Sequence, residues 1–155
     1  MILLKGITGF TSIQEYFDIP KISNESIKEA TEKFVINNTE YVIVNLIEPT
    51  QNSNYYLLNL KNIINNYIVK LIFNSHYKYF SCVEKEVSWC ERIFSDLPQS
   101  IINNYESFGF SYLSKQILEK KVSANEMKLL ANCEKEQIEY WESEIFGEII
   151  YNNYD

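Results

Sequence analysis

The sequence predicts an α+β fold. In it, an antiparallel β-sheet of four or more strands, mainly in the N-terminal half, packs with helices, and the C-terminal half is mostly helical. Two observations support this prediction. Four short runs rich in β-branched and aromatic residues lie between positions 41 and 83 and are separated by turn-forming residues. After position 96, apolar residues recur at spacings of three and four, which is typical of helices with one buried face.

A single domain spanning residues 1–155 is expected from the length of 155 residues. A chain of this size buries roughly two thirds of its unfolded surface around one core. Its contents of 46% hydrophobic and 23% charged residues are typical of folded proteins. The sequence contains no internal repeat and no low-complexity linker that would mark a second domain.

The first forty residues predict a strand, a connecting segment and a helix. Residues 2–8 are apolar and β-prone, which favours a short strand, and residues 11–20 connect it to the next element. Ser23 or Asn24 can cap a helix that runs to about Asn37. The predicted apolar stripe of this helix consists of Ile27, Ala30, Thr31, Phe34 and Val35.

Two β-hairpins are expected next. Residues 41–47 are the strongest strand signal in the chain, and residues 55–60 follow after a loop short enough for a hairpin, which favours antiparallel pairing. Residues 67–73 and 77–83 form a second pair of the same kind. A turn or a short helix over residues 61–66 joins the two pairs.

Helical patterns dominate the chain after Glu84. Following a less regular segment that contains Trp89 and Cys90, the sequence Asp96-Leu-Pro-Gln99 has the pattern of a capping box with Asp96 as the N-cap. It predicts a helix over residues 97–107. The apolar face of this helix and its stop signal are Leu97, Ile101, Ile102, Tyr105, Phe108 and Gly109.

The last third of the chain predicts shorter elements. Residues 114–120 favour a short helix, and Ser123 with the glutamate three residues later forms a capping box for a helix that reaches Cys133. Residues 138–141 are expected to be extended. Residues 145–152 are expected to be helical, although a glycine within them weakens the helical pattern.

The sequence lacks the usual catalytic and metal-binding motifs. His76 is the only histidine and lies in a predicted tight turn without a nucleophile motif such as GxSxG, so we expect it to face solvent. Cys82, Cys90 and Cys133 lack CxxC spacing, which favours reduced, partly buried thiols over a disulfide or a zinc site. No phosphate-binding glycine motif occurs. We therefore expect no catalytic residue, no cofactor and no metal ligand.

The N-terminus lacks the pattern of a secretory signal, and no window approaches 18 uninterrupted apolar residues, so a cytoplasmic protein without a membrane partner is expected. A formal net charge of −7 disfavours nucleic acid as a partner, because binding to phosphates requires clustered lysine and arginine. An acidic surface instead favours basic protein partners and accelerates their encounter. The sequence leaves self-association open.

The acidity is concentrated in residues 134–155, where seven carboxylates against Lys135 alone give a net charge of −6. The apolar residues of this segment, among them Trp141 and Phe146, can pack on the sheet while the glutamates project into water. Exposed tyrosines are common anchors at interfaces, and carboxylates around them pair with lysine or arginine. The candidate partner-binding residues are Glu134, Glu136, Glu139, Glu142, Glu144, Glu148, Tyr151, Tyr154 and Asp155.

The segments Tyr140-Trp141, Gly147-Glu-Ile-Ile-Tyr-Asn152 and Tyr154-Asp155 resemble the "YW…GEIIFN.WD" ending of small bacterial immunity proteins. These proteins are encoded beside toxins of contact-dependent growth inhibition and related polymorphic toxin systems. The chain departs from this ending in having tyrosine at positions 151 and 154 and no Lys-Pro after Trp141. Two further segments are also similar to the family, namely Leu4-Lys-Gly-Ile-Thr-Gly-Phe10 and the series Asp96-Leu-Pro98, Tyr105-Glu-Ser-Phe-Gly109 and Leu113-Ser114.

The resemblance implies a cytoplasmic antitoxin that binds one cognate toxin domain, often a nuclease, and blocks its basic active site without catalysis. The shared Tyr-Trp, glycine and asparagine positions are expected to dock the C-terminus onto the core. Two alternatives remain from the residues alone. One is an acidic adaptor for another basic protein, and the other is a small hydrolase that uses a carboxylate pair, such as Glu84 with Glu86 or Glu134 with Glu136.

Overall fold

The computed structural model of the protein describes residues 1–88 and 91–154. Its strands are β1 (Tyr41–Ile47), β2 (Tyr55–Asn62), β3 (Ile68–Asn74), β4 (Tyr79–Glu86), β5 (Arg92–Ser95) and β6 (Ser111–Tyr112). Its helices are α1 (Asn24–Asn37), α2 (Gln99–Ser107), α3 (Lys115–Leu118), α4 (Asn132–Tyr140) and α5 (Phe146–Ile150).

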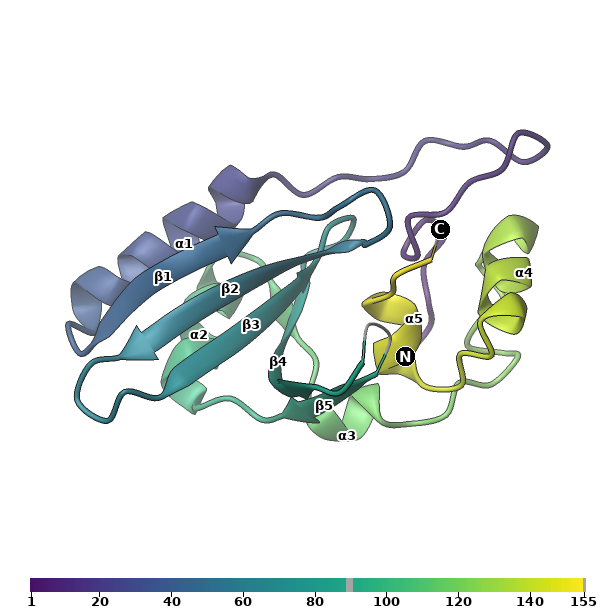
Figure 1. Cartoon of the computed structure of the whole chain (residues 1–155). Helices are drawn as coiled ribbons and strands as arrows, with labels where there is room; N and C mark the ends of the chain where they lie inside the picture. Colours follow the sequence, from purple (N-terminus) through teal and green to yellow (C-terminus); the bar gives the residue numbers. More distant parts are fainter. Residues whose placement is uncertain (89–90, 155) are drawn as a thin grey trace.

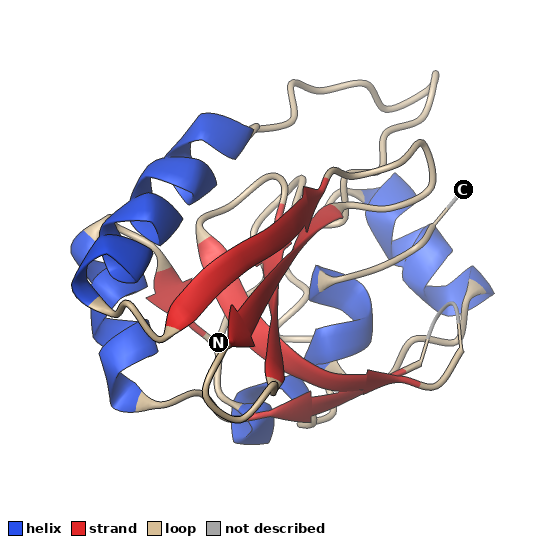
Figure 2. Cartoon of the chain, turned by 60° about the vertical axis from the view of Figure 1, so that its left-hand side comes forward, coloured by secondary structure: helices blue, strands red, loops and turns tan. Residues whose placement is uncertain are grey.

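The strands form one sheet with the order β1-β2-β3-β4-β5, in which all neighbours are antiparallel (Figure 1). The short β6 pairs in parallel with β4. Helices lie on both sides of this twisted sheet (Figure 2). The predicted α+β class is therefore confirmed, with the sheet mainly in the N-terminal half and most helices later in the chain.

Both predicted hairpins are confirmed. β1 pairs with β2, and β3 pairs with β4, with boundaries close to the predicted ones. The segment between the hairpins contains a turn at residues 63–65. Alternation decides which side chains are buried: Leu58, Leu60 and Leu71 point to one face and are at most 2% exposed.

The helical character expected after Glu84 is wrong for residues 85–88 and 91–95, which contain the end of β4 and the strand β5. β5 returns antiparallel to β4 and places Phe94 opposite Val83, and both side chains are buried. A strand of four residues has too few positions to show a periodicity, so this pairing is decided by contacts with β4 rather than by local sequence. Trp89 and Cys90 lie outside the described residues.

The helices α1 and α2 cover one face of the sheet. α1 is confirmed, because Ser23 Oγ accepts the N–H of Ser26 and the predicted stripe is buried or partly buried. Its Thr31 hydroxyl lies 2.7 Å from the Tyr105 hydroxyl of α2, and these buried groups satisfy each other. The first core lies between these two helices and the sheet.

The α2 helix is confirmed, but its predicted N-cap is wrong. The helix begins at Gln99, and its N-cap position is Pro98, which offers no side-chain acceptor. The Asp96 carboxylate accepts instead from the Tyr112 hydroxyl at 2.8 Å and the Lys115 N–H at 3.0 Å. Gly109 ends the helix as predicted, with a φ of 82° in the left-handed region.

Two predictions for the last third of the chain are wrong. The capping box at Ser123 forms, since the Glu126 carboxylate accepts from both the N–H and the hydroxyl of Ser123, and Glu126 also binds Lys120 at 2.7 Å. Residues 124–129 nevertheless form turns, and the next helix, α4, begins only at Asn132. Residues 138–141 are not extended, since α4 continues to Tyr140. The short helices predicted at 114–120 and 145–152 are confirmed as α3 and α5.

The predicted strand over residues 2–8 is also wrong. This segment forms turns on the second face of the sheet, where Leu3 and Ile7 are fully buried. Gly6 and Gly9 have φ values of 87° and 78°, which interrupt an extended chain. Together with α3, α5 and the C-terminal residues, these turns enclose a second core around Ile72.

Candidate functional site

The C-terminal segment is docked through its glycine and asparagine, as the sequence led us to expect. Gly147 lies against the Phe94 ring so closely that a Cβ atom there would be 2.4 Å from Phe94 Cε2. Ile149 and Ile150 in the same helix are fully buried. α5 can therefore approach β5 only because residue 147 has no side chain.

Three buried asparagines connect the chain termini to the sheet. The Asn54 and Asn74 amides each donate to the carbonyls of Ile7 and Ile150, at 2.6–3.0 Å. Asn152 donates to Thr8 O at 3.1 Å, and its own N–H donates to Asn54 Oδ1 at 2.8 Å. Asn152 belongs to the family-like ending and Thr8 to the family-like opening, so these resembling segments contact each other inside the protein.

Glu134 is the first candidate partner-binding residue that the structure places elsewhere than expected. Its side chain is 0% exposed, and its carboxylate accepts from Gly6 N, from Thr8 N and from the Thr8 hydroxyl at 2.6 Å. It also accepts from Ala131 N at the start of α4. These internal donors hold the charge inside the fold, so the expectation that Glu134 projects into water is wrong.

The expected exposure of the two C-terminal tyrosines is wrong as well. Tyr151 is 0% exposed and stacks at an angle on Phe94, while burial raises the pKa of its phenol well above the ordinary value. Its hydroxyl has no hydrogen-bond partner within the described part of the chain. Tyr154 is buried beside Trp141 and donates to Ser143 Oγ at 2.8 Å. Tyr151 is therefore unavailable as a surface anchor, and Tyr154 does not project from the surface but lines a small cavity.

Two further glutamates have structural partners at the surface. Glu148 caps α5 by accepting the Glu144 N–H at 2.9 Å and the Ile145 N–H at 3.4 Å. The Glu144 carboxylate binds Lys121 Nζ at 2.6 Å, and this ion pair lowers the pKa of Glu144. Asp155, also a candidate, lies outside the described residues.

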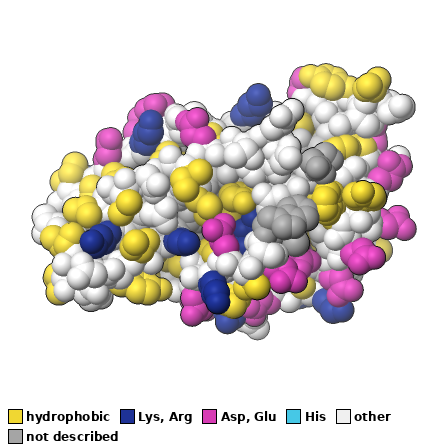
Figure 3. All heavy atoms as spheres, viewed as in Figure 1, with side chains coloured by type: hydrophobic (Ala, Val, Ile, Leu, Met, Phe, Trp, Pro, Cys, Tyr) yellow, Lys and Arg dark blue, Asp and Glu magenta, His cyan; other side chains and the backbone are white. Residues whose placement is uncertain are grey.

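The exposed candidates without an ion pair, Glu136, Glu139 and Glu142, form one acidic patch at α4 together with Tyr140, which was not among the candidates. Glu136, Glu139 and Tyr140 lie within one face of the helix, and Glu142 follows the C-cap residue Trp141. All four side chains are exposed, and the Tyr140 ring is 75% exposed. We call these four residues the α4 acidic face. Acidic side chains gather over this end of the molecule in Figure 3.

A small cavity of about 210 Å³ adjoins the α4 acidic face. Three carboxylates, from Glu91, Glu142 and Glu148, line it together with the Trp141 and Tyr154 rings. Carboxylates beside aromatic faces suit a lysine or arginine side chain. Glu91 was not among the predicted candidates, because it lies far from the acidic segment in the sequence.

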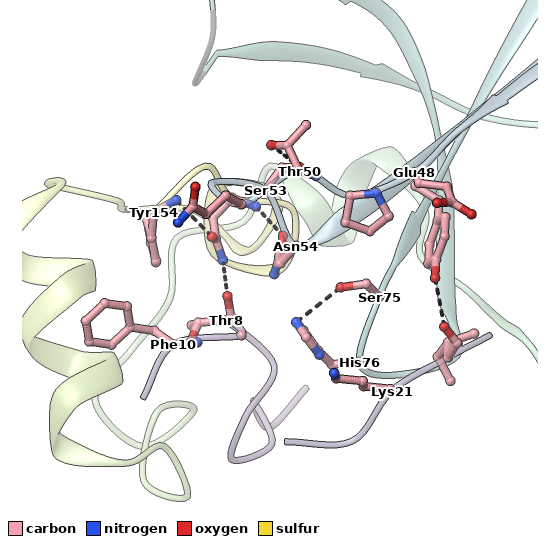
Figure 4. A pocket seen from close by; sticks show the side chains of 16 residues that line it. Thr8, Phe10, Lys21, Glu48, Thr50, Ser53, Asn54, Ser75, His76 and Tyr154 are labelled. Atoms are coloured by element: carbon pink, nitrogen blue, oxygen red, sulfur yellow. Dashed lines mark hydrogen bonds between the residues drawn. The ribbon is translucent and has the colours of Figure 1, made fainter. Parts of the chain in front are cut away.

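A larger cavity of about 440 Å³ lies between the N-terminal turns, the β1–β2 loop and the turn after β3 (Figure 4). His76 lies in this wall and is half-buried, so its predicted exposure is wrong although its position in a turn is right. Its Nδ1 lies 2.8 Å from Pro20 O and its Nε2 lies 3.1 Å from Ser75 Oγ. Burial lowers the pKa of His76, which favours the neutral ring.

The cavity offers little of what hydrolysis requires. Because a carbonyl oxygen can only accept, Nδ1 of His76 donates to Pro20 O, and Nε2 is left to accept from Ser75. However, the N–H groups of Ser75, His76 and Gly9 already donate to Asn54 O, Asn74 Oδ1 and Gly6 O. Stabilisation of an oxyanion needs free donors of this kind. Glu48 is the only carboxylate among the described residues that line the cavity.

The remaining expectations concern the cysteines, the two carboxylate pairs, metal-ligating side chains and membrane-spanning helices. Cys82 and Cys133 are free thiols as predicted, but they are buried rather than partly buried, and burial raises the pKa of both. Glu84 and Glu86 are exposed, whereas Glu134 is internal. Within residues 1–88 and 91–154, no group of three or more metal-ligating side chains is gathered, and no helix is long and apolar enough to cross a membrane.

A scan against protein-family models, a search of curated proteins and a search of solved structures found no match to this chain.

Proposed function

We propose that the protein binds a basic surface of a partner protein through the α4 acidic face, and that this partner is a cognate toxin domain which the protein neutralises. The observation that carries the proposal is the combination of three exposed carboxylates with the exposed Tyr140 ring. Within the described residues, no ion pair engages Glu136, Glu139 or Glu142. Their charge is therefore available to an incoming cation.

The α4 acidic face contributes to both the rate and the strength of the proposed association. Uncompensated surface charge attracts an oppositely charged partner over roughly 10 Å at about 0.1 M salt. Tyrosine is enriched among residues that dominate binding energy, because it supplies a large, rigid contact area and a polar tip. The adjoining cavity near Glu142 and Trp141 can accept one basic side chain of the partner.

The resemblance to immunity proteins supports a toxin, and in particular a nuclease, as the partner. Nucleases bind phosphate groups with basic active sites, which an acidic protein complements. The buried positions of Gly147 and Asn152 support a scaffolding role for the resembling motif. The α4 acidic face could then differ between immunity proteins that recognise different toxins.

The test is co-expression with the toxin domain encoded by the adjacent gene, read as growth and as the association rate of the purified proteins. We expect protection by the wild-type chain. Reversal of Glu136, Glu139 and Glu142 to lysine should slow association by about tenfold or more and reduce its salt dependence.

The matched control reverses three exposed glutamates outside this face, namely Glu29→Lys, Glu32→Lys and Glu106→Lys. It makes the same change in net charge and should preserve most of the association rate. If both triple variants slow association equally, net charge rather than the α4 acidic face determines binding. Absence of protection from any adjacent toxin would exclude the immunity function and leave an adaptor for another basic protein.

A second candidate function is hydrolysis in the larger cavity, which the Ser75–His76 hydrogen bond favours. In this mechanism neutral His76 accepts the proton of the Ser75 hydroxyl as the oxygen attacks an acyl carbon. The protonated ring then donates this proton to the leaving group as its bond to the acyl carbon breaks, and water releases the acyl group from Ser75. The test is labelling with a fluorophosphonate probe, with Ser75→Ala as the control. Labelling of the wild type that disappears in the variant would support the hydrolase, and no labelling would exclude it.

A further inference from the structure

The second face of the sheet is covered at one end only. Side chains from β1, β2 and β3 form three rows across this face, in the order Val42–Lys61–Ile68, Asn45–Asn59–Lys70 and Ile47–Leu57–Ile72. Ile72 in the third row is part of the second core. The first two rows point away from the first core, and none of the described helices lies in front of them in Figure 1. We call these two rows the open sheet face.

The open sheet face is apolar and basic. Val42 is 41% exposed and Ile68 is 44% exposed, and Lys61 and Lys70 are at its centre and side. The Asn59 amide donates to Asn45 Oδ1 at 2.7 Å, so these two side chains satisfy each other in part. None of the six side chains in the two rows is acidic.

The charge of this surface is opposite to that of the α4 acidic face. One combines two cations with exposed Val42 and Ile68, and the other combines three carboxylates with the exposed Tyr140 ring. In Figure 3, hydrophobic and basic side chains lie over the sheet on the left, while acidic side chains gather on the right over α4. The two surfaces therefore lie at opposite ends of one side of the molecule.

We propose that the open sheet face binds the α4 acidic face of a second copy of this chain, in a twofold dimer that makes this contact twice. The twofold axis lies parallel to this side of the molecule and perpendicular to the line that joins the two surfaces. The left end of each molecule then lies over the right end of the other. Each basic and apolar sheet then meets an acidic helix. Such an interface is self-complementary, as a twofold dimer requires.

The edge of β1 is a less suitable interface for a second copy. Antiparallel pairing of two β1 strands about Val44 would place the carboxylates of Glu40 and Glu48 opposite each other. Like charges in directly opposed positions destabilise strand pairing. Charge therefore favours the contact between the sheet face and the helix over the continuation of the sheet.

The dimer is expected to be weak and sensitive to salt. Its charged side chains are at least partly exposed, and ion pairs of this kind are individually weak and screened by counterions. It also uses the α4 acidic face, which the proposed function assigns to the toxin. Self-association and toxin binding should therefore exclude each other, although dimer formation itself does not depend on the existence of a toxin.

The experiment is sedimentation velocity of the purified full-length chain over a range of concentrations, at about 0.01 M and about 1 M salt. We expect dimers at low salt and monomers at high salt. The sheet variant, Lys61→Glu with Lys70→Glu, and the helix variant, Glu136→Lys with Glu139→Lys, should each be monomeric, because each carries like charges on both surfaces.

An equimolar mixture of the two variants should form dimers again, since both contacts become attractive in the mixed pair. The control Lys28→Glu with Lys33→Glu, on the exposed side of α1, should behave as the wild type. Circular dichroism confirms that each variant is folded. A monomeric wild type at low salt, unchanged association of either variant, or a monomeric mixture of folded variants would overturn the proposal.

The sheet variant also separates this proposal from the proposed function. It removes the basic surface of the dimer but leaves the α4 acidic face unchanged, so it should still bind and neutralise the toxin. The helix variant should be monomeric and should also associate more slowly with the toxin. Loss of toxin binding in the folded sheet variant would place the toxin on the open sheet face and overturn the assignment of that face to a second copy.

Discussion

Replacing Tyr151 with phenylalanine should stabilise the protein. The Tyr151 ring is fully buried against Phe94, with ring centroids 6.2 Å apart, so Tyr151→Phe preserves the ring and removes only the hydroxyl. That hydroxyl has no hydrogen-bond partner within the described part of the chain. Burying an unpaired polar group costs about 1–3 kcal/mol. We therefore expect the free energy of unfolding to rise by about 1 kcal/mol.

The assay is urea unfolding followed by tryptophan fluorescence, with Tyr105→Phe as the matched control. Tyr105 is equally buried, but its hydroxyl lies 2.7 Å from Thr31 Oγ1. Its removal should lower the free energy of unfolding by about 1 kcal/mol. The two variants make the same chemical change and should shift stability in opposite directions.

Destabilisation of Tyr151→Phe by as much as Tyr105→Phe would refute this reasoning, because it would mean that the Tyr151 hydroxyl makes a favourable contact in the folded protein. The measurement thus tests the internal position of a residue that the sequence suggested as a surface contact.

Three further predictions concern the docking of the two termini and its response to pH. Gly147→Ala should destabilise the fold by about 1–3 kcal/mol, because the new methyl group would overlap the Phe94 ring, and Phe94→Leu in the same chain should recover part of the loss. Asn152→Asp should lower the free energy of unfolding by about 3 kcal/mol, because a carboxylate would face two carbonyl oxygens in place of the amide that donates to them. The pKa of Glu126 is lowered to about 2, mainly by its hydrogen bond with Lys120. Its contribution to stability is therefore present above about pH 4.5 and is lost as the pH falls toward 2.

The measurements for these predictions are thermal and urea unfolding. Equal stability of Gly147→Ala and the wild type would show that α5 does not pack closely on β5. Asn152→Ala, which removes the donors without adding a charge, is the control for Asn152→Asp and should be less damaging. For Glu126, the control is Glu126→Gln, in which the loss of stability between pH 4.5 and 2 should be smaller. An identical pH profile in this variant would exclude Glu126 as a contributor.

Local signals in the sequence were sufficient for much of the fold. Ser23 caps α1 as predicted because its hydroxyl contacts an N–H only three residues later. The hairpin of β1 and β2 follows from two apolar runs joined by a short loop. In these cases the interacting residues are close in sequence, so composition and spacing carry the necessary information.

Contacts between distant residues explain the predictions that failed. Residues 2–8 have the composition of a strand, but their polar groups are satisfied by Glu134 and by asparagines far along the chain. The segment that begins at Ser123 has the pattern of a helix start, yet the Glu126 carboxylate is also held by Lys120. The local propensity of a segment for a strand or a helix is overridden when several hydrogen bonds to distant residues favour another conformation.

The sequence by itself determined that the charge of this protein is concentrated in its last 22 residues, because net charge is a property of composition. It could not determine which carboxylates face solvent. The tertiary structure decided this: Glu134 and Glu136 are two positions apart in the chain, yet the first is buried among N–H donors and the second is exposed on α4. The physical reason is that a helix turns by about 200° over two residues, so that neighbouring acids meet different environments.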